Sequence, residues 1–190
     1  MLDAILSPEW QDRYYSFNSR WADDEMMASM QNGSGDHWFA LLTSAGVALH
    51  GIAHEYPMFR GDSPWPGIFD GLPREFHANF MEEPAFDTAS STFCIWRRAT
   101  DDRWSCGGVQ FPHGDDPDGS AWLLSMLAGK PQQYVQFAAD YYEREIDVAD
   151  ASAVYRHAPL TEALVKRLNP AMELESLVED IAEIGYPDAD

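Results

Sequence analysis

Residues 36–55 read DHWFALLTSAGVALHGIAHE. Two runs rich in residues that favour β-strands flank the small turn residues Ser44-Ala45-Gly46. We therefore predict a hairpin with strands at 36–43 and 47–55, joined either by the two-residue turn Ala45-Gly46 or by all three residues. A second pair of such runs, at 91–99 and 103–111, predicts a second hairpin.

Helical patterns lie on both sides of the hairpins. Ser7-Pro8-Glu9 has the composition of a helix start and Asn32-Gly33 that of a helix stop, so we predict two helices within residues 1–33. From residue 120 to residue 184 we predict a run of helices separated by glycine and proline. Strands and helices do not alternate, which indicates the α+β class. The expected fold is an antiparallel sheet of two hairpins, about four strands, with the N-terminal helices and the C-terminal run of helices packed on it.

Length and composition indicate one folded domain. The chain has 190 residues, of which 45% are hydrophobic and 13% aromatic, enough for a sizeable core. We predict a single domain over residues 1–190, made of segments 1–33, 36–111 and 120–184. No apolar run approaches the roughly 20 residues of a membrane-spanning helix, and the N-terminus lacks the pattern of a secretory signal. We expect a cytoplasmic protein, with Cys94 and Cys106 as free thiols.

The charge is strongly acidic. Asp and Glu number 32 against 12 Lys and Arg, so the formal net charge is -20, and every quarter of the chain is negative. Such a surface repels nucleic acid and anionic membranes and attracts cationic partners. The basic residues are too few and too scattered to form a nucleic-acid groove. The charge therefore predicts a basic protein as partner and excludes nucleic acid and membrane.

Two acids and two imidazoles gather at the open end of the first predicted hairpin. With a two-residue turn, His37 faces His54 and Asp36 faces Glu55; with a three-residue turn, Asp36 faces His54. These four residues are candidates for acid–base catalysis or for binding a divalent metal. His50 does not join them, because four strand residues, roughly 13 Å, separate it from His54. The alternative interpretation is an ordinary solvated strand end.

A proline-rich loop provides a second candidate surface. Residues 63–67 read SPWPG, which holds Trp65 extended between two prolines. With Tyr56, Phe59 and Asp62 nearby, Trp65 is a candidate for an exposed aromatic patch that binds a partner. The alternative is that Trp65 turns inward and closes the core.

The acidic turn at residues 113–119, HGDDPDG, is similar in composition to a calcium loop. Aligning Gly119 with the sixth position of an EF-hand places Gly114 first and Ser125 twelfth, where acids are required. We therefore predict a structural turn in which Asp118 or Ser120 caps the following helix.

Five short strings resemble the landmarks of a family of uncharacterised bacterial cytoplasmic proteins. The strings are Gly35-Asp36, Ala53-His54-Glu55, Trp65-Pro66-Gly67, Phe93-Cys94-Ile95-Trp96-Arg97 and Asp116-Pro117-Asp118-Gly119-Ser120. The likeness runs from the first hairpin to Ile184-Gly185-Tyr186-Pro187. The resemblance implies no catalytic residue, cofactor or substrate.

The sequence contains no nucleophile elbow, phosphate loop, zinc signature or dinucleotide fingerprint, so we predict no cofactor. The favoured hypothesis is a non-enzymatic binding protein of the immunity type, which covers a cationic protein through its acidic surface. The alternative is a metal-binding, hydrolase-like enzyme with its site at Asp36, His37, His54 and Glu55. A third hypothesis assigns the charge to solubility alone. The sequence predicts no oligomeric state.

Overall fold

The computed structural model describes residues 1–187, which divide into two compact units. The sheet unit comprises Phe17–Ser125, and the helical unit comprises Met1–Ser16 together with the chain from Met126 onward. The helical unit is therefore built from both ends of the chain and does not coincide with any of the three predicted segments.

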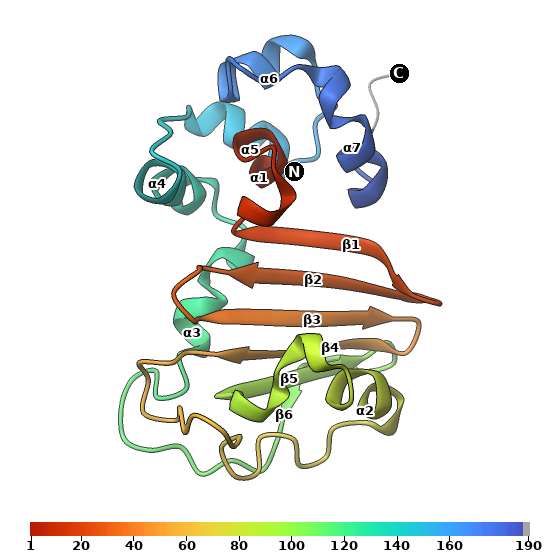
Figure 1. The fold of residues 1–190 in the computed structure, drawn as a ribbon, viewed down its shortest axis with the longest axis vertical. Helices are drawn as coiled ribbons and strands as arrows, with labels where there is room; N and C mark the ends of the chain where they lie inside the picture. The colour runs from red at the N-terminus through yellow and green to blue at the C-terminus, as the bar shows by residue number, and fades with distance from the viewer. Residues whose placement is uncertain (188–190) are drawn as a thin grey trace. The chain divides into compact units, whose positions relative to one another are not determined.

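The sheet contains six antiparallel strands in simple chain order (Figure 1). The strands are β1 (Tyr15–Ala22), β2 (Glu25–Gln31), β3 (His37–Thr43), β4 (Gly46–Ile52), β5 (Phe93–Arg98) and β6 (Ser105–Cys106). The α+β class is confirmed, and the sheet is larger than the four strands expected.

The prediction of two helices within residues 1–33 is wrong. This region holds α1 (Leu2–Leu6) and the 3₁₀ turn η1 (Trp10–Asp12), followed by β1 and β2. Asp23 and Asp24 form the turn between β1 and β2, in which Asp24 has a φ of 60°. Met, Ala and Gln favour helices locally, but β2 pairs with β3 along its whole length, from Glu25–Thr43 to Gln31–His37. Sheet pairing overrides local propensity here.

The two predicted hairpins are present with shifted registers. Thr43 pairs with Gly46, so the first turn is Ser44-Ala45, one residue earlier than the two-residue turn considered. In the second hairpin Ile95 pairs with Cys106, which places Cys94 and Cys106 on opposite faces of the sheet. Both cysteines are free thiols, as predicted.

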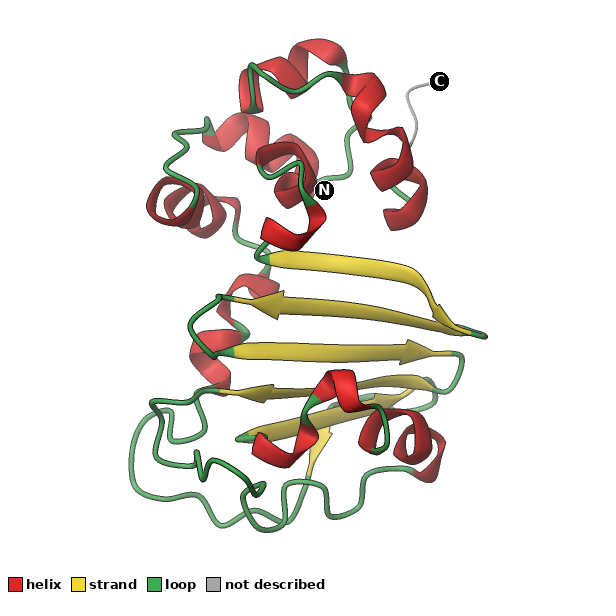
Figure 2. Cartoon of the chain, viewed as in Figure 1, coloured by secondary structure: helices red, strands yellow, loops and turns green. Residues whose placement is uncertain are grey.

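One face of the sheet carries the core of the sheet unit. This face is packed with α2 (Arg74–Met81) and with the short turns η2 (Pro84–Phe86) and η3 (Thr88–Ser90) (Figure 2). Rings dominate the core, whose buried members are Met27, Phe39, Leu41, Ala48, Leu72, Phe76, Phe80, Phe86, Cys94 and Trp96. A short helix, α3 (Ser120–Leu123), follows the acidic turn.

The helical unit confirms the predicted C-terminal run of helices. Its elements after η4 (Ser125–Ala128) are α4 (Pro131–Tyr141), α5 (Val148–Tyr155), α6 (Glu162–Leu168), η5 (Leu174–Leu177) and α7 (Val178–Ile184). Asp147 and Thr161 cap α5 and α6 by accepting the backbone N–H groups of Ala149 and Leu164. No helix within residues 1–187 has the length and apolar character needed to span a bilayer.

Candidate functional site

Asp36 and His54 meet at the open end of the first hairpin, although the register is neither of the two predicted. Oδ1 of Asp36 lies 2.7 Å from ring Nδ1 of His54 and accepts the backbone N–H of the same residue at 2.9 Å. Oδ2 accepts a hydrogen bond from Asn32 at 2.7 Å. Asp36 is buried and about a third of the His54 side chain is exposed. The pair is therefore held rigidly at the surface of the sheet unit.

The other two members of the predicted cluster lie elsewhere. Adjacent strand residues point to opposite faces, so His37 lies on the face away from Asp36, with its ring against Phe39. Glu55 is exposed beyond the end of β4. Within residues 1–187 these four side chains do not converge on a common point that suits a metal ion.

His50 faces the same buried side of the sheet as His37. Oγ of Ser91 donates to the carbonyl oxygen of Thr88 and therefore accepts from Nδ1 of His50, at 2.8 Å. Burial, with a smaller contribution from the neighbouring His37, lowers the pKa of His50 to about 3. Nε2 of His50 and of His37 are buried without a hydrogen-bond partner in the described part of the chain. Because His50 is fully buried, we assign it a structural role.

A stacked pair of aromatic rings lies beside the Asp36–His54 pair. Tyr56 and Trp122 lie with ring centroids 5.7 Å apart and planes 15° apart. Gly119 sits against Tyr56, since a Cβ built on Gly119 would lie 3.0 Å from Cγ of that ring. Trp122 is nevertheless 43% exposed. The two rings form a fixed platform that is open to solvent.

The platform lies in a strongly negative environment. The pKa of Tyr56 is raised by burial and then by the charges of Asp116, Asp36 and Glu55. The pKa of Asp118 is raised by burial, with a further rise from Asp116, while hydrogen bonds from Ser120 oppose both. No cation within residues 1–187 forms an ion pair with Glu55 or Asp116. We call Tyr56, Trp122, Glu55 and Asp116 the acidic aromatic surface.

The loop residues predicted to bind a partner are dispersed. Tyr56 belongs to the acidic aromatic surface, and Phe59 places its ring edge-on to His54 at 6.4 Å. Trp65 is half-buried and donates through Nε1 to the carbonyl oxygen of Gln110. Asp62 is exposed. Trp65 thus lies between the two alternatives, neither fully exposed nor closed into the core.

The acidic turn at residues 113–119 is structural, but the N-cap of α3 is Gly119 and not Asp118 or Ser120 as predicted. Asp118 accepts from the backbone N–H and the hydroxyl of Ser120, and Asp116 accepts from the backbone N–H groups of Ala121 and Trp122. The backbone of the turn is tied to the rest of the sheet unit, because Pro117 accepts from Met58 and Asp118 from Thr92. These bonds place Trp122 beside Tyr56.

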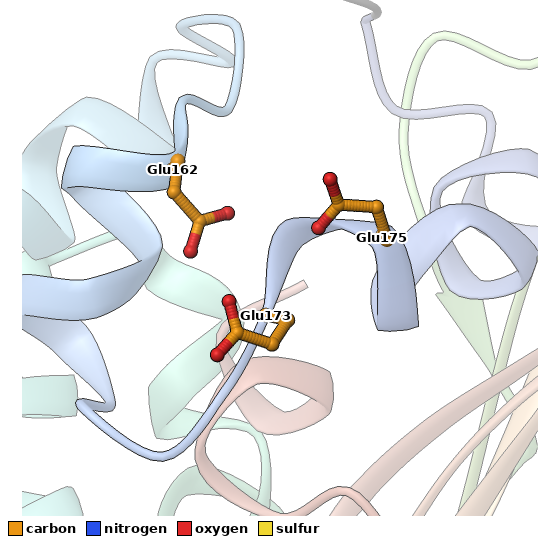
Figure 3. A group of neighbouring side chains, drawn as sticks. All are labelled: Glu162, Glu173 and Glu175. Atoms are coloured by element: carbon orange, nitrogen blue, oxygen red, sulfur yellow. The ribbon is translucent and has the colours of Figure 1, made fainter.

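A group of three carboxylates lies in the helical unit, within reach of a common ion. Figure 3 shows Glu162, Glu173 and Glu175, all exposed. Lys166 already occupies this group, since its Nζ binds Glu173 and lies 3.7 Å from Glu162. Glu162 also accepts the backbone N–H of Leu174. We therefore assign these carboxylates to holding η5 against α6.

Two residues of this region, Trp122 and Asn32, were not among the predicted site residues. Trp122 stands in an apolar run that suggested the core, but α3 has only four residues and buries Leu123 in its place. The preceding acidic turn is the feature of the sequence that favours an exposed Trp122, because its hydrogen bonds orient the first residues of α3. Asn32 was assigned to a helix stop, whereas it closes the β2–β3 connection.

Compared with protein-family models, with curated proteins and with solved structures, the chain matches none of them. The resemblance drawn from the five sequence strings therefore stays a prediction.

Proposed function

We propose that the chain is a binding protein that recognises a basic protein through the acidic aromatic surface. The observation that carries this proposal is the rigid, exposed Tyr56–Trp122 pair with acidic charges acting on it. Aromatic side chains fixed in place provide contact area with little loss of conformational entropy on binding. Uncompensated carboxylates around them favour a cationic partner and disfavour an acidic one.

The whole-chain charge supports the same partner. A net charge of -20 accelerates encounter with a basic protein and makes association sensitive to salt. An immunity-type protein that covers a basic toxin fits this description, because covering a cationic active site needs a charged, preformed surface rather than catalytic groups. The partner's identity follows from experiment and not from the fold.

The proposal is tested by comparing two doubly substituted variants of equal charge. The site variant carries Glu55→Gln and Trp122→Ala. The control carries Asp102→Asn and Trp104→Ala, an exposed acid and a tryptophan that is 47% exposed. The control positions follow β5, whose end pairs with Gly46, at the opposite end of the sheet from His54.

Each protein, immobilised, is used to recover partners from source cells at low and at high salt, and the recovered proteins are identified by mass spectrometry. We expect the wild type and the control to retain one basic protein that high salt releases, and the site variant to lose it. Retention of the same protein by the site variant would contradict the proposal.

The Asp36–His54 pair favours a second candidate, acid–base catalysis. An ionised carboxylate only accepts hydrogen bonds, so Nδ1 of His54 carries a proton and Nε2 presents its lone pair. This orientation suits a general base. The test is hydrolysis of a panel of ester and phosphoester substrates by wild type, Asp36→Asn and His54→Gln. Activity lost in both variants supports this candidate, and activity that survives both excludes it.

A further inference from the structure

The acidic aromatic surface carries a more specific inference about its partner. A basic partner could place either a lysine or an arginine side chain on these two parallel rings beside the carboxylates. Lysine presents a compact, strongly hydrated charge, whereas arginine presents a planar guanidinium that is less strongly hydrated. The planar group stacks on an aromatic face and keeps its N–H groups free, at its edge, for carboxylates.

The geometry of the platform matches a planar cation. The rings of Tyr56 and Trp122 are stacked and nearly parallel, with 15° between their planes, and Trp122 keeps 43% of its surface exposed. Tyr56 is backed by Gly119, where a Cβ would lie 3.0 Å from the ring, so the pair does not need to reorganise to receive a ligand. A guanidinium thus finds a flat face already in position.

The acids at the platform are placed by different parts of the chain. Glu55 precedes Tyr56 beyond β4, and Asp116 lies in the turn before α3, where it accepts the backbone N–H of Trp122 at 3.0 Å. The charges of both carboxylates reach the Tyr56 ring. A cation stacked on the platform is therefore attracted by both carboxylates.

We propose that the acidic aromatic surface receives an arginine side chain of the basic partner, whose guanidinium stacks on Trp122 and is neutralised by Glu55 and Asp116. This inference rests on the proposed function, because it names the side chain by which that partner is held. It assigns Trp122 as the residue that discriminates arginine from lysine, and Glu55 as a residue that attracts either cation.

The test uses two peptides of equal length and equal charge, one with arginines and one with lysines, each alternating with glycine. Affinities are measured by calorimetry at one fixed salt concentration for wild type, Trp122→Leu, Glu55→Gln and the control Trp104→Leu. Leucine keeps an apolar side chain while removing the aromatic face. Because Trp122 is exposed, we expect the variant to fold, and circular dichroism verifies this.

We expect the arginine peptide to bind wild type about two- to five-fold more tightly than the lysine peptide, as for a cation on an exposed ring. Trp122→Leu removes this preference, Trp104→Leu keeps it, and Glu55→Gln weakens both peptides alike. Equal affinities in wild type, or a preference that survives Trp122→Leu, overturn the arginine assignment.

The same measurements separate this inference from the proposed function. If both peptides bind equally, and Glu55→Gln and Trp122→Leu weaken them more than Trp104→Leu does, the binding surface stands and the arginine assignment falls. If none of the three substitutions changes either affinity, peptide binding occurs elsewhere on the acidic surface, and both proposals fall.

Discussion

Asp36 binds His54 twice through one oxygen, which accepts ring Nδ1 at 2.7 Å and the backbone N–H at 2.9 Å. The second carboxylate oxygen accepts from Asn32, whose own side-chain oxygen accepts the backbone N–H groups of Ser34 and Asp36. One buried carboxylate therefore joins the β2–β3 connection to the segment after β4. This joint positions the chain that leads to Tyr56.

We expect Asp36→Asn to destabilise the protein by about 1–3 kcal/mol, because an amide cannot accept from all three donors and leaves a buried group unsatisfied. Urea unfolding measures the loss. The exposed Asp62→Asn serves as the matched control and should change stability by no more than about 0.5 kcal/mol. Nitrogen NMR of His54 should show loss of the single tautomer in Asp36→Asn, and an unchanged tautomer would contradict the assignment.

His50 predicts a loss of stability in acid. Burial lowers its pKa from 6.5 to about 3, so the folded state holds the neutral ring. The stabilisation is complete above pH 6.5 and is lost as the pH falls from 6.5 towards 3. Between pH 7.5 and pH 4.5 the wild type should lose roughly 2–3 kcal/mol of stability through His50, at about 1.36 kcal/mol per pKa unit. We expect His50→Leu not to show this loss.

Ser91→Ala is the control for His50. It removes the hydrogen bond to Nδ1 but leaves the ring buried, so it should lower stability at every pH while retaining the acid slope. Urea unfolding across the pH range compares the three proteins. A slope that persists in His50→Leu would assign the acid sensitivity to other groups.

In the helical unit, the buried carboxylate of Asp3 accepts from the hydroxyls of Tyr134 and Tyr142 and from the backbone N–H of Tyr15. We expect Tyr134→Phe to cost about 1–3 kcal/mol, because it removes a hydrogen bond from a buried carboxyl group. Tyr155→Phe is the control, since the Tyr155 hydroxyl has no hydrogen-bond partner within residues 1–187, and it should cost less. Equal losses in urea unfolding would contradict the role of Asp3.

Asp3 should make the free energy of unfolding depend on pH in the opposite sense to His50. Burial raises the pKa of Asp3, while the hydrogen bonds from Tyr134, Tyr15 and Tyr142 oppose the rise. The folded state thus holds its proton more tightly than the unfolded state. This contribution is present at low pH and is lost as the pH rises through the raised pKa. In Asp3→Asn this loss of stability between mildly acidic and neutral pH should be absent. Urea unfolding of both proteins at the two pH values measures it.

Gly119→Ala should displace the aromatic platform. Gly119 has a φ of +72°, and a Cβ there would lie 2.2 Å from Cβ of Ala53. We expect a cost of about 2–4 kcal/mol from left-handed backbone strain and overpacking together. Gly61→Ala, at φ +81° with no atom within 4 Å, should cost only the backbone part. Near-ultraviolet circular dichroism should change for Gly119→Ala and stay unchanged for Gly61→Ala.

Features that depend on residues close together in the chain could be predicted from the sequence alone. The strands of the first hairpin, the helices from residue 120 onward and the structural nature of the acidic turn all depend on residues close in the chain. Asp36 faces His54 in one of the two predicted registers, because both residues flank one hairpin. The actual turn at Ser44-Ala45 lies outside both registers, and the pair meets through loop residues at the sheet end.

The acidity of the chain, its α+β class and the helices from residue 120 onward follow from the order of residues, because charge, helix punctuation and capping act over a few positions. Pairing between strands decided the rest. β2 is a strand because β3 offers it a full ladder of partners, although its own residues favour a helix. The Tyr56–Trp122 platform joins segments far apart in the chain, brought together by backbone bonds and by the space that Gly119 leaves. Local preferences are worth fractions of a kcal/mol per residue, and the burial and pairing of distant segments outweigh them.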